Sequence, residues 1–299
     1  MEVSISPRTA RTKITGVIGH PIGHSFSPVM HNAAFELLKL DYTYLAFDVP
    51  PHYLAEALQG LIALGIVGVN VTIPHKEAVI PLLDDLSSEA HATGAVNTLV
   101  NEGGKLSGHN TDVHGFVEMM KPLRRSITGK EVSILGAGGA ARAVLYGLMT
   151  HFRPKSIHLL NRSVERANNL KDFFASSFGF QQIDVVDLYM PSAHKALSQS
   201  KLIVNTTPVG MVPNVDESPI PDNQILVKGQ VLVDLVYNPP ETQLTRMAKK
   251  QGLKTISGME MLLHQGAKSF ELWTNKKMPL DRVRQTVHSF LAHKSPRTV

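Results

Sequence analysis

Cysteine is absent from the 299 residues of this chain. Without it the chain can form no disulfide, no thiolate zinc site and no cysteine nucleophile. The 14 histidines show no H-E-x-x-H or comparable ligand spacing. We therefore expect no metal site.

Long apolar runs are also missing. One long stretch without Asp, Glu, Lys or Arg, residues 57–75, is interrupted by three glycines, an asparagine and a proline, and is unsuited to spanning a bilayer. The N-terminal segment, residues 1–13, has no apolar stretch of the kind found in a secretory signal. We expect a cytoplasmic protein with no membrane partner.

Basic charge exceeds acidic charge only slightly, with a net charge of +5. Most of the surplus lies near the two ends, in Arg8, Arg11 and Lys13 against Glu2, and in Lys294 and Arg297. Each end therefore carries two positive charges, and one remains for the body of the chain. No basic stripe interleaved with aromatic residues is present. We expect no nucleic-acid partner.

A glycine-rich turn follows a buried, strand-like run in residues 132–141, VSILGAGGAA. Gly136 permits a tight turn, and Gly138 lets a pyrophosphate approach backbone N–H groups at a helix N-terminus. Ala141 stands in place of the third glycine of the G-x-G-x-x-G pattern, which that pattern tolerates. The turn predicts a dinucleotide site formed by Gly136, Ala137, Gly138, Gly139 and Ala140.

The next strand, residues 156–161, ends on cationic and polar residues. NAD-binding proteins usually offer an acidic side chain to the ribose 2′-hydroxyl at this point. This chain instead has Asn161, Arg162, Ser163 and Arg166, and two arginines one helical turn apart suit a 2′-phosphate. The predicted cofactor is NADP.

Hydrophobicity patterns predict an α/β fold with two α/β domains. The first has a mainly parallel sheet, with strands at 15–19, 44–49 and 67–73, a hairpin at 95–100 and 105–108, and helices from Pro28, through 53–64 and through 113–123. The second is of the Rossmann type, with strands at 131–135, 156–161, 183–186, 201–205 and 231–236. We predict a substrate-binding domain over residues 1–113, an NADP-binding domain over 114–258, and C-terminal helices over 259–299 that return to the first domain.

Polar residues gather in the first domain in a pattern that suits a small polyhydroxylated acid. Ser25 and Ser27 are two residues apart, so in an extended segment they face the same way; Pro28 suits the first helical position, with Ser27 as N-cap. In residues 68–74 the side chains of Val69, Val71 and Ile73 form one face, and those of Asn70 and Thr72 form the other. Lys76, at the start of a helix where a lysine opposes the dipole, joins Asn97 and Asp112 as a candidate for the site.

Eight motifs, in order along residues 15 to about 270, make the chain resemble the shikimate dehydrogenase family. They are GHPIGHSFSP (19–28), NVTIPHK (70–76), GAVNT (94–98), NTD (110–112), GAGGAAR (136–142), NTTPVGM (205–211), DLVYNP (234–239) and MLLHQ (261–265).

The resemblance implies NADP-dependent, reversible reduction of 3-dehydroshikimate to shikimate, in chorismate and aromatic amino-acid biosynthesis. It implies Lys76 and Asp112 as the catalytic pair, the former being general acid and base. It implies that the remaining substrate contacts are Ser25, Ser27, Thr72, Asn97, Tyr237 and Gln265. It adds Thr206, Leu235, Gly258 and Met261 to the cofactor residues identified above.

Two alternatives remain open. A quinate/shikimate dehydrogenase that uses NAD is a sibling enzyme, although Arg162 and Arg166 argue against NAD. A non-catalytic NADP-binding sensor would have no reason to keep both Lys76 and Asp112. The sequence leaves a homodimer open.

Overall fold

The computed structural model describes residues 8–221 and 225–293, so Glu2, Lys294 and Arg297 lie outside the described residues. The chain divides into two compact units: unit 1 comprises Met1–Gly115 with Leu262–Val299, and unit 2 comprises Phe116–Met261. Both boundaries fall inside helices, α5 (Thr111–Met120) and α11 (Met259–Thr274). Within the described ranges, no helix has the length and apolar character needed to cross a membrane.

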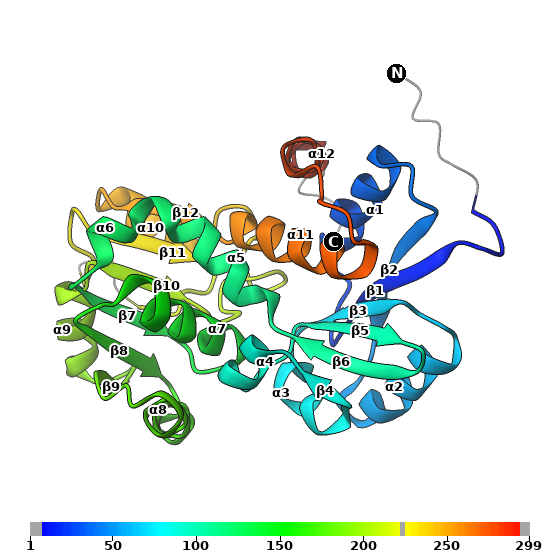
Figure 1. The fold of residues 1–299 in the computed structure, drawn as a ribbon. Helices are drawn as coiled ribbons and strands as arrows, with labels where there is room; N and C mark the ends of the chain where they lie inside the picture. The colour runs from blue at the N-terminus through cyan, green and yellow to red at the C-terminus, as the bar shows by residue number, and fades with distance from the viewer. Residues whose placement is uncertain (1–7, 222–224, 294–299) are drawn as a thin grey trace. The chain divides into compact units, whose positions relative to one another are not determined.

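Unit 1 is built on a six-stranded mixed sheet in the order β2-β1-β3-β5-β6-β4 (Figure 1). Its strands are β1 (Lys13–Gly19), β2 (Tyr42–Asp48), β3 (Gly68–Val71), β4 (Asp85–Leu86), β5 (Thr98–Glu102) and β6 (Lys105–His109). Its helices, besides α5 and α11, are α1 (Ser27–Leu37), α2 (Leu54–Ala63), α3 (His75–Ala78), α4 (Ser88–Thr93) and α12 (Leu280–His293), with short 3-10 turns η1 (Pro51–Tyr53) and η2 (Ile80–Leu82). β5 runs antiparallel to both of its neighbours, and the other pairs are parallel.

Apolar and polar side chains alternate along β3, so its two faces have different surroundings. Val69 and Val71 join a buried apolar cluster with residues of α2, while Asn70 contacts polar groups elsewhere in the unit. The alternation predicted for residues 68–74 holds only as far as Val71, because the strand ends there. Ile73, predicted to share the apolar face, is 52% exposed.

Unit 2 is a six-stranded sheet in the order β12-β11-β10-β7-β8-β9, and every pair in it is parallel. Its strands are β7 (Glu131–Leu135), β8 (Ser156–Asn161), β9 (Ile183–Asp187), β10 (Leu202–Asn205), β11 (Val231–Asp234) and β12 (Lys254–Ser257). Its helices are η3 (Lys121–Leu123), α6 (Arg124–Ile127), α7 (Gly139–Gly147), η4 (Leu148–Phe152), α8 (Val164–Phe178), α9 (Pro191–Gln199) and α10 (Gln243–Lys250).

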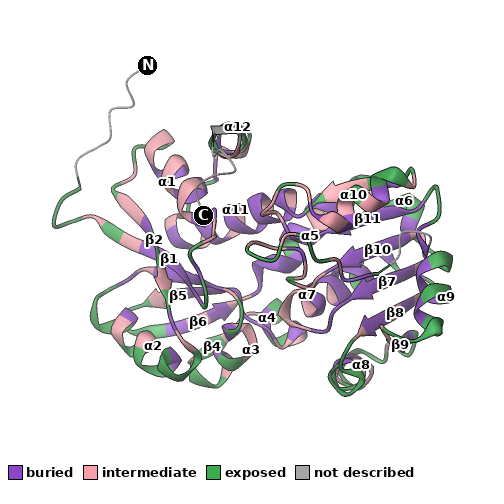
Figure 2. Cartoon of the chain, turned by 180° about the vertical axis from the view of Figure 1, so that it is seen from behind, coloured by how far each residue is buried: buried purple, intermediate pink, exposed green. Residues whose placement is uncertain are grey.

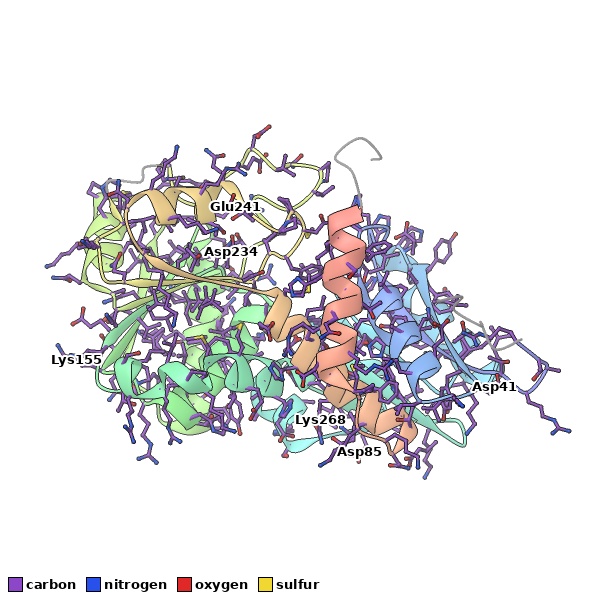
Figure 3. All side chains as sticks on the ribbon, turned by 90° about the horizontal axis from the view of Figure 1, so that it is seen from above. Asp41, Asp85, Lys155, Asp234, Glu241 and Lys268 are labelled. Carbon is purple, nitrogen blue, oxygen red and sulfur yellow. The ribbon has the colours of Figure 1, made fainter. Side chains whose placement is uncertain are left out.

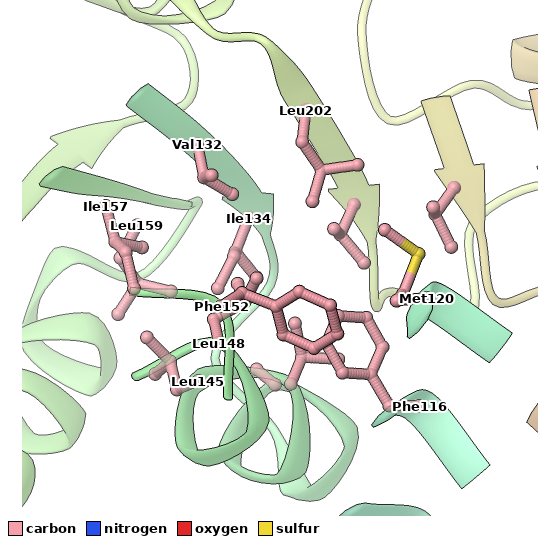
Figure 4. Close-up of a cluster of buried hydrophobic side chains, with 14 of the residues drawn as sticks. Phe116, Met120, Val132, Ile134, Leu145, Leu148, Phe152, Ile157, Leu159 and Leu202 are labelled. Atoms are coloured by element: carbon pink, nitrogen blue, oxygen red, sulfur yellow. The ribbon is translucent and has the colours of Figure 1, made fainter. Parts of the chain in front are cut away.

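Successive residues of these strands point into two separate apolar cores. Ile134 belongs to a cluster with residues of α7, η4 and α8, shown in Figure 4, and the next residue, Leu135, belongs to a cluster with residues of α9 and α10. Helices therefore cover both faces of a parallel sheet, as in doubly wound folds. Figure 2 shows the strands of this sheet as mostly buried. The predicted fold class, two α/β domains with a Rossmann-type second sheet, is confirmed.

The start of α1 differs from the prediction. The helix begins at Ser27, and its N-cap is Phe26 rather than Ser27. The residues before it are not extended, because the N–H of Ser25 donates to the carbonyl of Ile22 at 3.1 Å. The Oγ of Ser25 accepts the N–H of Ser27 at 3.3 Å, so Ser25 provides the acceptor for a first-turn N–H that has no partner within the helix.

Candidate functional site

The candidate residues of unit 1 gather at one edge of its sheet. β1 and β3 are parallel, and β6 runs in the same direction because β5 is antiparallel to both β3 and β6. The carboxyl ends of β1, β3 and β6 therefore meet where β5 begins. Residues 20–27, 72–76 and 110–112 follow these three ends, and Asn97 directly precedes β5. Ligands of α/β proteins bind at this edge.

Lys76 and Asp112 form an ion pair at this edge. The Nζ of Lys76 donates to Oδ2 of Asp112 at 2.6 Å, and the side chains are only 15% and 8% exposed. The backbone holds Lys76 in place: its carbonyl accepts the N–H of Val96 at 2.8 Å. The ammonium of Lys76 is thus a positioned group that can donate a proton, the kind of group that general acid–base chemistry uses.

Asp112 is fixed from its other side by Asn97. The Oδ1 of Asn97 accepts the backbone N–H of Thr111 at 2.7 Å, and this N–H lies in the first turn of α5. The Nδ2 of Asn97 consequently faces Asp112, donating to its Oδ1 at 2.9 Å. Both carboxylate oxygens of Asp112 therefore have a donor, and one of these donors is the lysine.

Gln265, one of the predicted substrate residues, lies in α11 and reaches the same group. Its Oε1 accepts from Nδ2 of Asn97 at 3.2 Å, and its Nε2 donates to the carbonyl of Leu262 at 2.9 Å. The sequence places Asn97 and Gln265 168 positions apart, so only the folded chain could pair them. Lys76, Asn97, Asp112 and Gln265 are thus one connected set.

Ser25, Ser27 and Thr72 lie in the loops after β1 and β3, at the same edge. The N–H of His20 donates to the carbonyl of Ile73 at 3.0 Å and ties these two loops together. Ser27 is buried, whereas Ser25 and Thr72 are half-buried. Two partly exposed hydroxyls, at the same sheet edge as the ammonium of Lys76, suit a carboxylate or hydroxyl ligand.

Four further polar residues support this set and were not among the predicted site residues: Asn70, Thr98, Thr111 and Ser269. All are buried and hydrogen-bonded to one another or to Asn97. Asn70 and Thr98 are directly opposite each other in the β3–β5 pair. Asn70 was visible as a polar residue in an apolar strand, but its partners depend on a strand pairing that spacing does not reveal.

In unit 2 the glycine turn links β7 to α7. Gly136 has a φ of +102°, and a Cβ there would lie 2.7 Å from the Oγ1 of Thr206, so glycine is required. Gly138 is the N-cap of α7, and the first turn of this helix has neither a side-chain cap nor an acidic residue. Its N–H groups therefore favour an anion.

The residues after β8 stand beside this turn. Nε of Arg166 donates to the carbonyl of Ala137 at 3.0 Å, while Arg162 is exposed. Ser163 caps α8, its Oγ accepting the N–H of Arg166 at 3.3 Å, and Nδ2 of Asn161 donates to the carbonyl of Ser163 at 2.8 Å. The arginine on the glycine turn, and a strand end at Asn161 and Arg162 in place of the acidic residue typical of NAD sites, fit a phosphorylated dinucleotide.

The remaining predicted cofactor residues are spread over the ends of β10, β11 and β12. Thr206 donates from Oγ1 to the carbonyl of Leu135 at 2.7 Å, which ties it to the start of the glycine turn. Gly258 contacts the backbone of Leu235, where a Cβ would have no room. Met261 is 7% exposed and packs in the apolar cluster of α7 and α8. Tyr237, predicted to contact substrate, is half-buried in unit 2, three residues after β11.

Asp234, labelled in Figure 3, is a buried carboxylate that organises this edge of unit 2. It accepts hydrogen bonds from Thr242 Oγ1 at 2.5 Å, Asn205 Nδ2 at 2.9 Å and the N–H of Val236 at 3.1 Å. Burial raises its pKa, and these hydrogen bonds act against that rise. Asn205 in turn accepts from the N–H and Oγ1 of Thr207, so Asp234 fixes the loop that carries Thr206.

A glycine turn in a doubly wound unit, with arginines in place of acid after the second strand, defines a dinucleotide-binding protein. A lysine–carboxylate pair at the strand ends of a second α/β unit adds proton-transfer chemistry. The fold and its sites are those of a nicotinamide-dependent oxidoreductase.

Comparison with known proteins gives the family. Residues 17–99 match the shikimate dehydrogenase substrate binding domain, and residues 258–288 match the shikimate 5'-dehydrogenase C-terminal domain. A shikimate dehydrogenase (NADP(+)) of Pelodictyon phaeoclathratiforme is 45% identical over 281 residues, covering 93% of this chain and 98% of that protein. The chain belongs to the shikimate dehydrogenase family.

Solved structures of shikimate dehydrogenases are similar to this chain in fold and sequence. A crystal structure of shikimate dehydrogenase in complex with NADP+ has a TM-score of 0.87 and 40% identity, covering 96% of this chain and 98% of that one. The enzyme of Thermus thermophilus in complex with NADP(H) and shikimate has a TM-score of 0.80 and 36% identity, with coverage of 93% and 99%. A quinate dehydrogenase of Corynebacterium glutamicum in complex with NAD has a TM-score of 0.83 but 32% identity, with coverage of 93% and 99%.

Proposed function

We propose that this chain catalyses the NADP-dependent, reversible reduction of 3-dehydroshikimate to shikimate, a step toward chorismate and the aromatic amino acids. The observation that carries the proposal is the buried Lys76–Asp112 pair, at 2.6 Å, with Asn97 on the second carboxylate oxygen. The relatives named as NADP-dependent shikimate dehydrogenases support the same substrate and cofactor.

NADP fits the residues of unit 2. The N–H groups from Gly136 to Ala140 would receive the pyrophosphate, and Asn161, Arg162, Ser163 and Arg166 would surround the 2′-phosphate. Thr206, Leu235, Gly258 and Met261 would line the remainder of the cofactor. When bound, the cofactor supplies the hydride.

The residues of unit 1 would bind the acid and move the proton. Ser25 and Ser27 would hold the carboxylate, and Thr72, Asn97 and Gln265 would surround the substrate, with Asn97 on its hydroxyls. During reduction the Nζ of Lys76 donates a proton to the C3 oxygen as negative charge develops there; in the reverse direction it takes that proton back. Asp112 keeps the ammonium aimed at that oxygen and compensates its charge.

The competing activity is that of a quinate/shikimate dehydrogenase using NAD. It differs in the cofactor, and Arg162 and Arg166 favour a phosphorylated ribose over the bare hydroxyl of NAD. A non-catalytic NADP sensor is the other alternative, and it gives no reason for an ion pair as buried as Lys76–Asp112. Burying two charges is costly unless they are well partnered, so a sensor would gain nothing from keeping them.

One assay separates these possibilities. The purified chain is incubated with shikimate or quinate, and with NADP or NAD, and formation of reduced nicotinamide is followed by absorbance. We expect the highest kcat/KM for shikimate with NADP. Higher kcat/KM for quinate with NAD would establish the competing enzyme, and no turnover in any combination, with NADP still bound, would establish the sensor.

The cellular location and the partners of the enzyme are part of the same proposal. We place it in the cytoplasm, acting on a small-molecule substrate with neither nucleic acid nor a membrane as partner. Whether two copies assemble is tested by light scattering during size-exclusion chromatography.

A further inference from the structure

Three buried hydroxyls from different elements lie close to one another, and two of them contact Asn97, which is hydrogen-bonded to Asp112. They belong to Thr98 in β5, Thr111 in α5 and Ser269 in α11, whose exposed fractions are 0%, 3% and 0%. The oxygens of Ser269 and Thr98 are 2.8 Å apart, those of Ser269 and Thr111 are 3.1 Å apart, and those of Thr98 and Thr111 are 3.2 Å apart. We call this group the hydroxyl cluster.

The hydroxyl cluster is oriented from the interior by Tyr44. The hydroxyl of Tyr44 lies 2.7 Å from Oδ1 of Asn70, and it must donate because a carbonyl oxygen can only accept. The Nδ2 of Asn70 is thereby turned toward the cluster, donating to Ser269 at 2.9 Å and to Thr98 at 3.0 Å. The direction of the hydrogen bonds from Tyr44 to Asn70, and from Asn70 to the cluster, follows from this fixed end.

The other end of the cluster reaches the catalytic carboxylate. The hydroxyl of Thr98 donates to Oδ1 of Asn97 at 3.2 Å. The Nδ2 of Asn97 donates to Asp112 and Gln265, as described above, and also to Oγ1 of Thr111 at 2.9 Å. A continuous path of hydrogen bonds therefore runs from Tyr44, through the cluster, to the partner of Lys76.

Within the hydroxyl cluster, Ser269 contacts both threonine hydroxyls, Asn70 and a carbonyl of its own helix. It follows Gln265 by four residues in α11, which places both on one face of the helix, and its Oγ donates to the carbonyl of Gln265 at 3.1 Å. A hydroxyl has one hydrogen and two lone pairs. Its one hydrogen goes to Gln265, so the Thr111 hydroxyl, 3.1 Å away, donates to it, as Asn70 does. Ser269 thereby uses its whole hydrogen-bonding capacity.

We propose that Ser269 is a positioning residue for the reaction: it locks the helix carrying Gln265 against Thr98 and Thr111, and thereby holds Asn97 and Asp112 in the orientation that aims Lys76. This inference rests on the proposed function. It predicts an effect on turnover from a residue that touches neither substrate nor cofactor, because small errors in the placement of a catalytic group lower the rate.

The primary variant is Ser269→Ala, which removes one oxygen and little volume. We expect kcat/KM for shikimate to fall about three- to tenfold, mostly through kcat, the range given by loss of one neutral hydrogen bond. The Kd of NADP, measured by fluorescence titration, should not change, because the glycine turn and its arginines belong to unit 2.

Thr274→Ala is the matched control. Thr274 lies in the same helix and makes the same kind of bond, from Oγ1 to the carbonyl four residues earlier, Phe270, at 2.7 Å. It takes no part in the hydroxyl cluster. We expect it to change the melting temperature as Ser269→Ala does, while kcat and KM stay within about twofold of the wild type.

Tyr44→Phe is a second variant, which reaches the cluster from the interior and keeps the aromatic ring. It removes the donor that orients Asn70, so kcat should fall in the same direction as for Ser269→Ala, and it serves as the test should Ser269→Ala fail to fold. If the wild type is active but both variants lower only the melting temperature, the cluster is structural and the inference is wrong. If the wild type fails to oxidise shikimate with NADP, the proposed function fails and the inference fails with it.

Discussion

His31 makes the stability of unit 1 depend on pH in a way that can be calculated. The residue lies in α1, fully buried, with its ring stacked on Tyr44 at a centroid distance of 4.3 Å. Phe270 and Trp273 lie close by, and neither ring nitrogen has a hydrogen-bond partner among the described residues. Burial lowers its pKa to about 3, so the folded protein holds this histidine neutral.

The size and direction of the effect follow from the two pKa values. In the unfolded chain the histidine titrates near its ordinary pKa of 6.5, and in the folded chain near about 3. Between these values only the unfolded chain binds the proton, so acid favours unfolding. The free energy of unfolding is unaffected above about pH 6.5 and falls by about 1.4 kcal/mol for each pH unit below it, about 2 kcal/mol at pH 5.

The assay is urea unfolding of the wild type and of His31→Phe at pH 7, 6 and 5. Phenylalanine keeps an aromatic ring against Tyr44 and cannot titrate, while all other groups are shared. We expect the difference in unfolding free energy between the two proteins to move by about 2 kcal/mol in favour of the variant from pH 7 to pH 5. Parallel pH dependence in the two proteins would refute the reasoning, because it would mean that His31 is protonated in the folded state as well.

Lys76→Ala should fold and bind NADP normally but lose about 10²–10⁴-fold in kcat, the usual contribution of general acid–base assistance; wild-type turnover in this variant would remove Lys76 from the mechanism. Ser25→Ala should raise KM for shikimate and leave the Kd of NADP unchanged, and a weaker NADP complex instead would contradict the assignment of unit 1 to the substrate. Arg162→Asp should raise KM for NADP about ten- to a hundredfold, from loss of a charge-assisted bond, with KM for NAD level or lower; NADP preference that survives the change would mean that the 2′-phosphate is bound elsewhere. Asp234→Ala should lower the free energy of unfolding by about 1–3 kcal/mol because the hydrogen-bond donors around it, among them Thr242 and Asn205, lose their acceptor, as chemical denaturation would measure; an unchanged midpoint and slope would show that these donors find other acceptors.

The sequence predicted the dinucleotide turn because everything that turn needs is local. A strand, a glycine that must take a positive φ and a helix start lie within a few residues, and Gly136 has the φ of +102° that the pattern requires. The replacement of an acidic residue by Asn161 and Arg162 at the end of β8 is likewise a feature of adjacent residues. Lys76 was notable by its position alone, as a lysine at the start of a helix.

Local pattern was less reliable where the chain leaves a regular element. Ser27 was expected as the cap of α1, but the helix starts at Ser27 because the preceding residues already turn. Ile73 continues the apolar alternation of β3 in the sequence, but the strand ends at Val71. Ile73 therefore lies outside the sheet and is exposed. Composition and alternation do not encode where a strand stops being paired.

The tertiary structure alone decided which polar groups meet. Ser269 and Thr98 are 171 residues apart in the sequence, and Thr98 looks like an ordinary β-branched strand residue until α11 packs beside it. A hydrogen bond needs two groups within about 3 Å and correctly aimed, and for distant segments that condition is set by sheet order and helix packing. Residue types near Lys76 and Gly136 therefore determined which chemistry the chain can perform, whereas packing determined that Asp112, Asn97, Gln265 and Ser269 form one hydrogen-bonded group, because only packing sets the distances between them.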